Sequence, residues 1–244
     1  MIIDAHTHVP TQSYADRYGN GAGDFLRACD ANEVFGAWVF PTEGLSDQDP
    51  AYNFHVIDYC SEYPSRLIPF CTAYPQLEGA ASVIRQAAEK GAKGIKLHPW
   101  LQGFSVTESY MAGIGEVASE LSLPIVFHDG TPPSSSPTQI AEFADAFPSV
   151  SVVLGHGGLH DLWMEAAAVA AARDNVYVIP SGVPSGSVGA VVREVGYQKI
   201  LFGSDLGYNE RDVQKYQLEK IHRLSLPEAH AAAILGGNAQ RILS

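Results

Sequence analysis

Short apolar runs alternate with longer amphipathic segments along the whole chain. The apolar runs are rich in Val, Ile and Phe and are bounded by turn residues, a pattern typical of β-strands, whereas the longer segments carry apolar residues at helical spacing. The pattern predicts eight strands, over residues 1–8, 34–40, 66–73, 92–98, 124–128, 150–155, 176–179 and 200–205.

Helical segments are predicted between and after these strands. They span residues 25–31, 51–62, 78–90, 108–121, 139–147, 161–173, 187–195, 213–224 and 227–243. Asp24 is the expected N-cap of the first helix. The polar, glycine-rich segment 11–23 and the proline- and serine-rich segment 131–137 are expected to be loops that follow strands.

Strands that each precede a helical segment favour a single parallel sheet. Eight repeats of this unit predict an α/β fold in which the sheet closes into a (β/α)8 TIM barrel. An open, doubly wound sheet stays an alternative because the sequence does not show closure, although no Gly-x-Gly-x-x-Gly turn follows the first strand. The composition does not change along the chain, so residues 1–244 are expected to form one domain.

The 244 residues carry 15 Lys and Arg against 27 Asp and Glu, a formal net charge of −12. A chain this acidic repels phosphate backbones, so we expect no nucleic-acid partner, and no basic or long apolar segment indicates a membrane. Cys29, Cys60 and Cys71 lack the spacing of a disulfide framework and are expected to be reduced thiols of a cytoplasmic protein. The first residues lack the pattern of a signal peptide.

Residues suited to metal and proton chemistry gather at the ends of the predicted strands. Five of the nine histidines and one aspartate lie there: His6, His8, His98, His128, His156 and Asp205. Because the carboxyl ends of barrel strands meet at one mouth, we expect these side chains to lie together. Residues i and i+2 of a strand share a face, so His6, His8 and Asp4 are expected to point the same way. Neutral imidazoles are common ligands of zinc and other transition metals.

These strand-end motifs, taken in order, resemble the metal-dependent amidohydrolase superfamily. The resemblance covers nearly the whole chain and is greatest to the amidohydrolase-related branch that includes aminocarboxymuconate-semialdehyde decarboxylase. The segments that carry it are Asp4–His8, Gly94–Pro99, Pro124–His128, Leu154–Gly158, Leu201–Asp205 and the tail Gly237–Leu243.

The resemblance implies a role for each matching residue. His6, His8, His128 and Asp205 would hold one divalent metal, most often zinc in this branch. Asp205 would also take a proton from the attacking water, and His156 would serve as an acid or base, or as electrostatic support for the substrate. Asp4 is expected behind the ligands, where it would orient an imidazole.

Lys96 is expected to point into the barrel with His98. In binuclear members of the superfamily a strand-four lysine is carboxylated and bridges two metals, whereas the Lys-x-His-Pro context of this chain resembles the mononuclear members. Lys96 is therefore expected to form a salt bridge or to anchor an anionic substrate. Lys96, His98, Trp100 and Tyr208 are predicted to contact the substrate, with Gln102 and Phe104 as further candidates.

These features predict a metal-dependent hydrolase in which activated water attacks the carbonyl carbon of a small ester, lactone or amide. The alternative is a metal-dependent, non-oxidative decarboxylase of a small, including aromatic, carboxylic acid, because that chemistry shares the same ligand set. A barrel that binds a ligand without turnover is the third option, and metal content discriminates it. A homo-oligomer is compatible with the sequence.

Overall fold

The computed structural model describes residues 1–208 and 212–244. Within them, short parallel strands alternate with helices. The strands are β1 Ile2–His8, β2 Val34–Phe40, β3 Leu67–Pro69, β4 Ile95–Leu97, β5 Ile125–Phe127, β6 Val152–Leu154 and β7 Val176–Val178. The α-helices are α1 Gln12–Tyr18, α2 Ala22–Asp30, α3 Ala51–Ser61, α4 Ala80–Glu89, α5 Pro99–Gln102, α6 Met111–Leu121, α7 Pro137–Ala146, α8 Trp163–Ala171, α9 Val188–Val195, α10 Val213–His222, α11 Glu228–Ala232 and α12 Asn238–Ile242.

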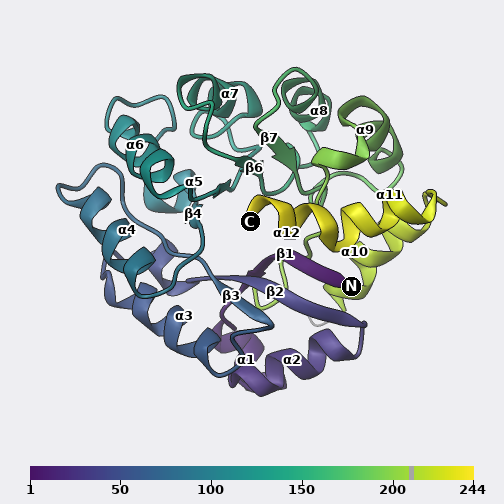
Figure 1. Ribbon diagram of the computed structural model, residues 1–244, viewed down its shortest axis with the longest axis horizontal. Helices are drawn as coiled ribbons and strands as arrows, with labels where there is room; N and C mark the ends of the chain where they lie inside the picture. Colours follow the sequence, from purple (N-terminus) through teal and green to yellow (C-terminus); the bar gives the residue numbers. More distant parts are fainter. Residues whose placement is uncertain (209–211) are drawn as a thin grey trace.

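The strands form two sheets, in the orders β1-β2-β3 and β4-β5-β6-β7, and backbone contacts link the sheets into one ring. A single bridge joins Cys71 to Ile95, which connects the end of β3 to β4. At the other junction, segment 200–206 lies between β7 and β1. Leu201 N donates to Val178 O at 2.9 Å, and Ala5 N donates to Phe202 O at 2.9 Å. The helices surround this ring, which is the predicted (β/α)8 TIM-barrel arrangement (Figure 1).

Segment 200–206 is not a regular strand, contrary to the prediction for residues 200–205. Its backbone has partners outside the sheet. Phe202 N donates to Ile234 O at 2.9 Å, and Ile234 lies in a π-helix over Ala233–Gly237. Because the wider turn of a π-helix departs from the regular α-helical ladder, a carbonyl there can accept from the barrel. The predicted helix over residues 227–243 is accordingly divided into α11, this π-turn and α12.

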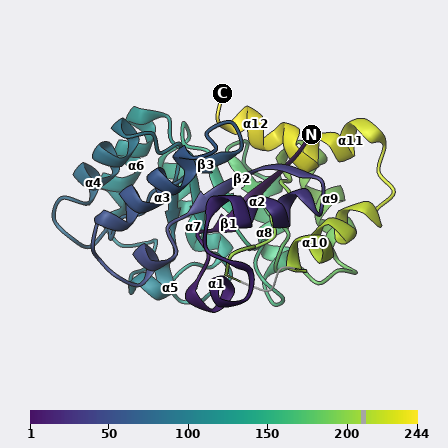
Figure 2. The same ribbon diagram turned by 90° about the horizontal axis from the view of Figure 1, so that it is seen from below.

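Inward-facing strand residues fill the barrel below the mouth. A buried cluster joins Trp38 and Phe40 of β2 to Phe70 after β3, and to Val126 and Val153. The rings of Trp38 and Phe70 stack at 4.9 Å. Helix α12 covers the end of the barrel where both chain ends lie, whereas α1 and α5 lie at the opposite end (Figure 2). Because α1 and α5 follow β1 and β4, that opposite end is the mouth.

Segment 11–23, predicted as a loop, contains α1 and the start of α2. The Thr11 side chain accepts a hydrogen bond from Tyr14 N at 3.3 Å and so caps α1. The N-cap of α2 is Gly21 rather than Asp24, whose carboxylate accepts from Gly21 N three residues back. The three cysteines are free and buried, as predicted. Over the residues described, no helix combines the length and apolar character that crossing a membrane requires.

Gly94, directly before β4, leaves room for the buried ring of Phe70. A Cβ atom at residue 94 would overlap that ring, whereas one at Gly113 in α6 would meet nothing within 4 Å. We expect Gly94→Ala to lower the free energy of unfolding by about 1–3 kcal/mol through overpacking. Gly113→Ala is the matched control and should raise it by about 0.5–1 kcal/mol, since alanine favours helix. Urea unfolding measures both; equal effects of the two substitutions would contradict this account.

Candidate metal centre

A β-bulge in β1 sets the direction of the side chains that form the site. Asp4 pairs with Ala37 of β2, but Thr7 pairs with Val39, so three steps along β1 match two along β2. One extra residue reverses the alternation of inward and outward side chains, and bulges next to active sites re-aim side chains in this way. After the bulge His6 and His8 point into the barrel, where both rings pack against Phe40.

Asp4, which precedes the bulge, points the other way, toward the surrounding helices. The prediction that it shares a face with His6 and His8 is therefore wrong, and its carboxylate binds no imidazole. One oxygen accepts from His6 N at 3.2 Å and Ser204 N at 2.9 Å. The other accepts from Ser204 Oγ at 2.5 Å and from Gln214 Nε2, on α10, at 2.9 Å. Asp4 thus ties the bulge of β1 to the residue before Asp205.

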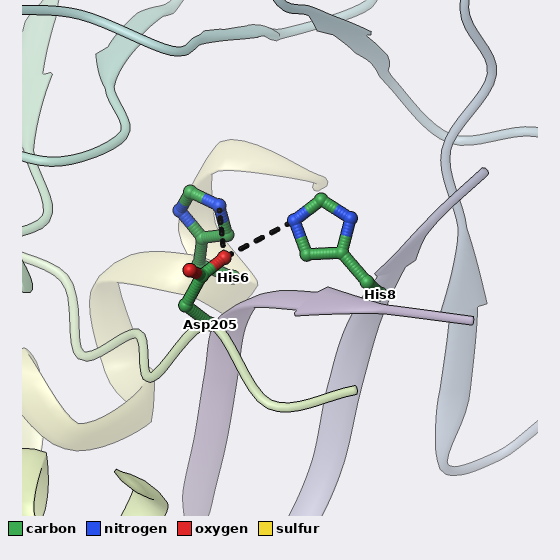
Figure 3. A group of neighbouring side chains, drawn as sticks. All are labelled: His6, His8 and Asp205. Carbon is green, nitrogen blue, oxygen red and sulfur yellow. Dashed lines mark ion pairs between the residues drawn. The ribbon is translucent and has the colours of Figure 1, made fainter. Parts of the chain in front are cut away.

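His6, His8 and Asp205 form a compact group of ligand atoms at the mouth (Figure 3). One atom from each side chain lies within 4.8 Å of the others. Asp205 Oδ1 is 3.3 Å from His6 Nε2 and 3.2 Å from His8 Nε2. Asp205 adopts a left-handed backbone conformation, with φ of 69°. Such conformations are sparsely populated outside glycine and cluster at functional sites.

The protonation of this group suits a metal ion. His6 Nδ1 lies 2.9 Å from Gly155 O and must carry the ring proton, because a carbonyl only accepts; Nε2 is left with its lone pair. Burial lowers the pKa of His6 to about 3 and also lowers the pKa of His8, so both rings are neutral at pH 7. Burial disfavours the charged Asp205 carboxylate, but its contacts with His6 and His8 outweigh this and hold its pKa well below its usual range. Two neutral imidazoles and a carboxylate aimed at one point are a ligand set that zinc accepts.

Lys96 is fully buried beside this group. Its Nζ lies 3.2 Å from His6 Nε2 and 4.9 Å from the centre of the Phe40 ring. Burial lowers the pKa of Lys96 to about 8, opposed by the charges of Asp205 and Asp129. The ammonium group therefore supplies positive charge at the bottom of the site near neutral pH.

The remaining strand-end histidines are at the same mouth. The rings of His98 and His128 stack with centroids 3.8 Å apart, and the rings of His128 and His156 meet edge to face at 4.4 Å. Burial lowers the pKa of all three. His128 is not part of the compact group of ligand atoms, so its role as a fourth ligand stays a prediction.

A cavity of about 240 Å³ opens over these side chains. It is lined by His8, Leu45, Lys96, His98, Trp100, Leu101, His128, His156, Asp205 and Tyr208. Trp100 and Tyr208 are 62% and 51% exposed, so both are accessible to a ligand at the entrance. Gln102 and Phe104, the further candidates for substrate contact, are buried away from it. The Gln102 side chain instead accepts a hydrogen bond from His98 N and donates to Ala73 O and to the hydroxyl of Thr72.

Two buried residues that belong to none of the predicted site motifs support the mouth. Asp129, next to His128, accepts from His156 N at 2.6 Å and from Gly158 N at 2.5 Å, and so shapes the turn after β6. Burial raises the pKa of Asp129 to about 6. Ser181, after β7, lies 3.0 Å from His156 Nδ1 through its hydroxyl oxygen. In the sequence, only its position directly after His128 could have indicated a role for Asp129. No motif in the sequence indicated a role for Ser181.

The comparison with known families agrees with this geometry. The model of the family described as "Amidohydrolase" matches residues 3–244. The chain belongs to the amidohydrolase family. No curated protein sequence matches it.

Several solved structures resemble this amidohydrolase over nearly their whole length. One is 5-carboxyvanillate decarboxylase from Sphingomonas paucimobilis, with a TM-score of 0.76, 16% identity and coverage of 99% of this chain and 98% of the other. Another is a probable 2-pyrone-4,6-dicarboxylic acid hydrolase from Acinetobacter baumannii. Its TM-score is 0.74 and its sequence identity 15%, and the match covers 99% of this chain and 98% of the other. A third is a 2,6-dihydroxybenzoate decarboxylase bound to 2,6-dihydroxybenzoate. Its TM-score is 0.72 and its sequence identity 14%, and the match covers 100% of this chain and 98% of the other. Decarboxylases and a hydrolase thus share the fold of this amidohydrolase.

Asp4→Asn tests whether the hydrogen bonds of the Asp4 carboxylate stabilise the fold around the bulge of β1. An amide group in place of one carboxylate oxygen would face two hydrogen-bond donors, whichever way it turns. We expect the free energy of unfolding to fall by about 1–3 kcal/mol, the cost of leaving buried polar groups unpaired. Thermal or urea unfolding measures it, with the exposed Asp58→Asn of α3 as the control. An unchanged stability would show that the four contacts of Asp4 do not hold this part of the fold.

Metal titration tests whether His6, His8 and Asp205, here called the ligand group, bind a metal ion. We expect about one equivalent of zinc per chain, since the compact group offers one set of converging ligand atoms. His8→Ala should weaken binding by more than the about 10- to 100-fold typical of losing an outer-shell partner. The exposed His160→Ala is the control. Titration with a competing chelator gives the affinities, and the same titration of His128→Ala tests the predicted fourth ligand. Two equivalents, with a carboxylated Lys96, would contradict the mononuclear site.

Proposed function

We propose that this amidohydrolase is a metal-dependent hydrolase of small esters, lactones or amides, with zinc as its metal. The observation that carries the proposal is the place of Asp205. Its carboxylate lies within 3.3 Å of both imidazoles of the ligand group and also lines the cavity. One side chain can therefore serve the metal and meet a water molecule that attacks a substrate in the cavity.

A divalent metal bound by His6, His8 and Asp205 would supply Lewis acidity and a lowered pKa for an attacking water. Asp205, kept ionised, would take the proton from the attacking water at a carboxylate oxygen. The ammonium group of Lys96 stabilises the negative charge that develops on the substrate oxygen, and its burial strengthens this interaction. His156, whose ring also lines the cavity, is the second group able to carry a proton.

The cavity limits the substrate to a small molecule. Its volume of about 240 Å³ is below the range of typical drug-sized ligand pockets. Among the described residues that line it, Asp205 is the sole carboxylate and Lys96 the sole cation, while the imidazoles are neutral. With Asp205 committed to the metal, Lys96 favours a substrate that carries a carboxylate or another anionic group. The hydrolase among the similar structures has citric acid bound, which has this chemistry.

Decarboxylation is the second candidate, and the buried ammonium group of Lys96 favours it. Beside the ligand group, Lys96 could pair with the carboxylate of a substrate that loses CO₂. A proton must then reach the carbon left behind, and His156 or Asp205 could deliver it. Two of the similar structures described above are decarboxylases of aromatic acids. The hydrolase proposal is preferred because Asp205 contacts both imidazoles and lines the cavity, which supports a role as a base toward water.

Product analysis separates these reactions. The zinc-loaded protein is offered lactones, esters, amides and aromatic carboxylates. Ring opening or release of an acid, without CO₂, is the expected result. Release of CO₂ from an aromatic carboxylate would replace the hydrolase proposal by the decarboxylase. If zinc binds but no substrate of any class is converted, the result would favour the third option, a protein that binds a ligand without converting it.

Asp205→Asn is expected to lower kcat/KM by about 100- to 10,000-fold, because the amide cannot accept the proton. The side chain keeps its shape, so circular dichroism should be unchanged. The exposed Asp58→Asn is the control and should retain full activity. A substrate turned over equally well by Asp205→Asn and the unaltered protein would overturn the role of Asp205.

A further inference from the structure

The carbonyl of Gly155 contacts two groups of the site at once. It lies 2.9 Å from Nδ1 of His6 and 3.1 Å from Oγ of Ser181. Ser181 Oγ in turn lies 3.0 Å from Nδ1 of His156. A chain of hydrogen bonds therefore runs from a metal ligand, through the end of β6, to the histidine that stands beside it. All of its side chains are buried.

The number of protons fixes the direction of each bond in this chain. The Gly155 carbonyl has no proton to give, so the Ser181 hydroxyl donates to it. That hydroxyl has only one proton, and its oxygen can then only accept from His156. Nδ1 of the neutral His156 ring must carry the proton. The reverse assignment would leave the oxygens of Ser181 and Gly155 3.1 Å apart without a proton between them.

Helix α10 holds Ser181 in place from behind. The carbonyl of Ser181 accepts from Gln217 Nε2 at 3.0 Å and from Lys220 Nζ at 2.8 Å. Lys220 Nζ also donates to Val183 O at 2.9 Å. Two side chains of one helix thus fix the turn after β7 on both sides of residue 182, which limits the positions open to the Ser181 hydroxyl.

We propose that Ser181 is a positioning residue that keeps the proton of His156 on Nδ1 and the lone pair on Nε2, for use in the cavity. The proposal rests on the proposed function for its catalytic consequence. A neutral His156 held in this way accepts a proton at Nε2 and does not donate one. His156 would then act as a base, or as an acid only after it has gained a proton. Gly155 O fixes the tautomer of His6 directly and that of His156 through Ser181.

Nitrogen NMR of protein labelled with ¹⁵N-histidine tests the tautomer without any substrate. Protonated and unprotonated ring nitrogens of a neutral imidazole have well-separated shifts, and His156→Gln identifies the signal of His156. We expect the Nδ1-protonated form in the unaltered protein. Ser181→Ala should shift His156 toward the Nε2-protonated form, and Ser181→Thr, which keeps a hydroxyl, should restore it. An Nε2-protonated His156 in the unaltered protein, or an unchanged signal in Ser181→Ala, would overturn the proposal.

Kinetics test the consequence once a substrate is known. Ser181→Ala should lower kcat by about 10- to 100-fold, as loss of an outer-shell partner does, with little change in KM. Ser181→Thr should recover most of kcat. A fall in kcat that hydroxyl replacement does not rescue, with the tautomer unchanged, would make Ser181 structural only. Absence of turnover in the unaltered protein would refute the proposed function, while the NMR result would still decide the tautomer.

The contribution of α10 to the position of Ser181 can be tested with two lysine substitutions on that helix, one of which is a control. Lys220→Met keeps the length of the side chain but removes both hydrogen bonds, so it should shift the tautomer in the same direction as Ser181→Ala, to a smaller extent. Lys215 is exposed on α10, and Lys215→Met should leave the signal of His156 unchanged. Equal effects of the two substitutions would overturn the part assigned to α10.

Discussion

The site depends on one extra residue in β1 and on the carboxylate that holds it. Without the bulge, the regular alternation that places Asp4 toward the helices would place His6 and His8 there too, away from the cavity. Asp4 binds the backbone of His6 on one side and of Ser204 on the other. The same carboxylate therefore supports the backbone beside all three side chains of the candidate metal group, His6, His8 and Asp205. Gln214 extends this support to α10.

Burial determines the protonation state of the histidines in the candidate metal group. It keeps the imidazoles of His6 and His8 neutral, which is the form that binds a metal, while the pKa of Asp205 lies well below its usual range. A buried lysine would be costly in an apolar setting, but Lys96 lies close to His6 and within reach of the charges of Asp205 and Asp129. The positive charge of Lys96 among neutral imidazoles is the feature of the cavity on which the proposal of an anionic substrate rests.

The sequence predicted the order of the elements and the mouth at which the histidines meet, because apolar strand runs and the residues at their ends are local patterns. It could not predict the direction of Asp4, since the bulge arises from pairing between β1 and β2 and leaves no mark in either strand alone. Helix α1 was missed because only Tyr14 of its residues is buried, which leaves no apolar stripe. Asp129 and Ser181 act on His156 across 27 and 25 residues. Such distant polar contacts have no spacing that a single sequence reveals.

The contact between Asp4 and Ser204 joins residues 200 positions apart. A growing chain on the ribosome therefore carries His6 and His8 long before it carries Asp205, and the ring cannot be joined at β1 until segment 200–206 has been made. Contacts of such wide sequence separation slow the folding of a domain, because closing a long loop costs entropy. The side chains of His6, His8 and Asp205 can therefore come together only in a chain that has been synthesised beyond residue 205.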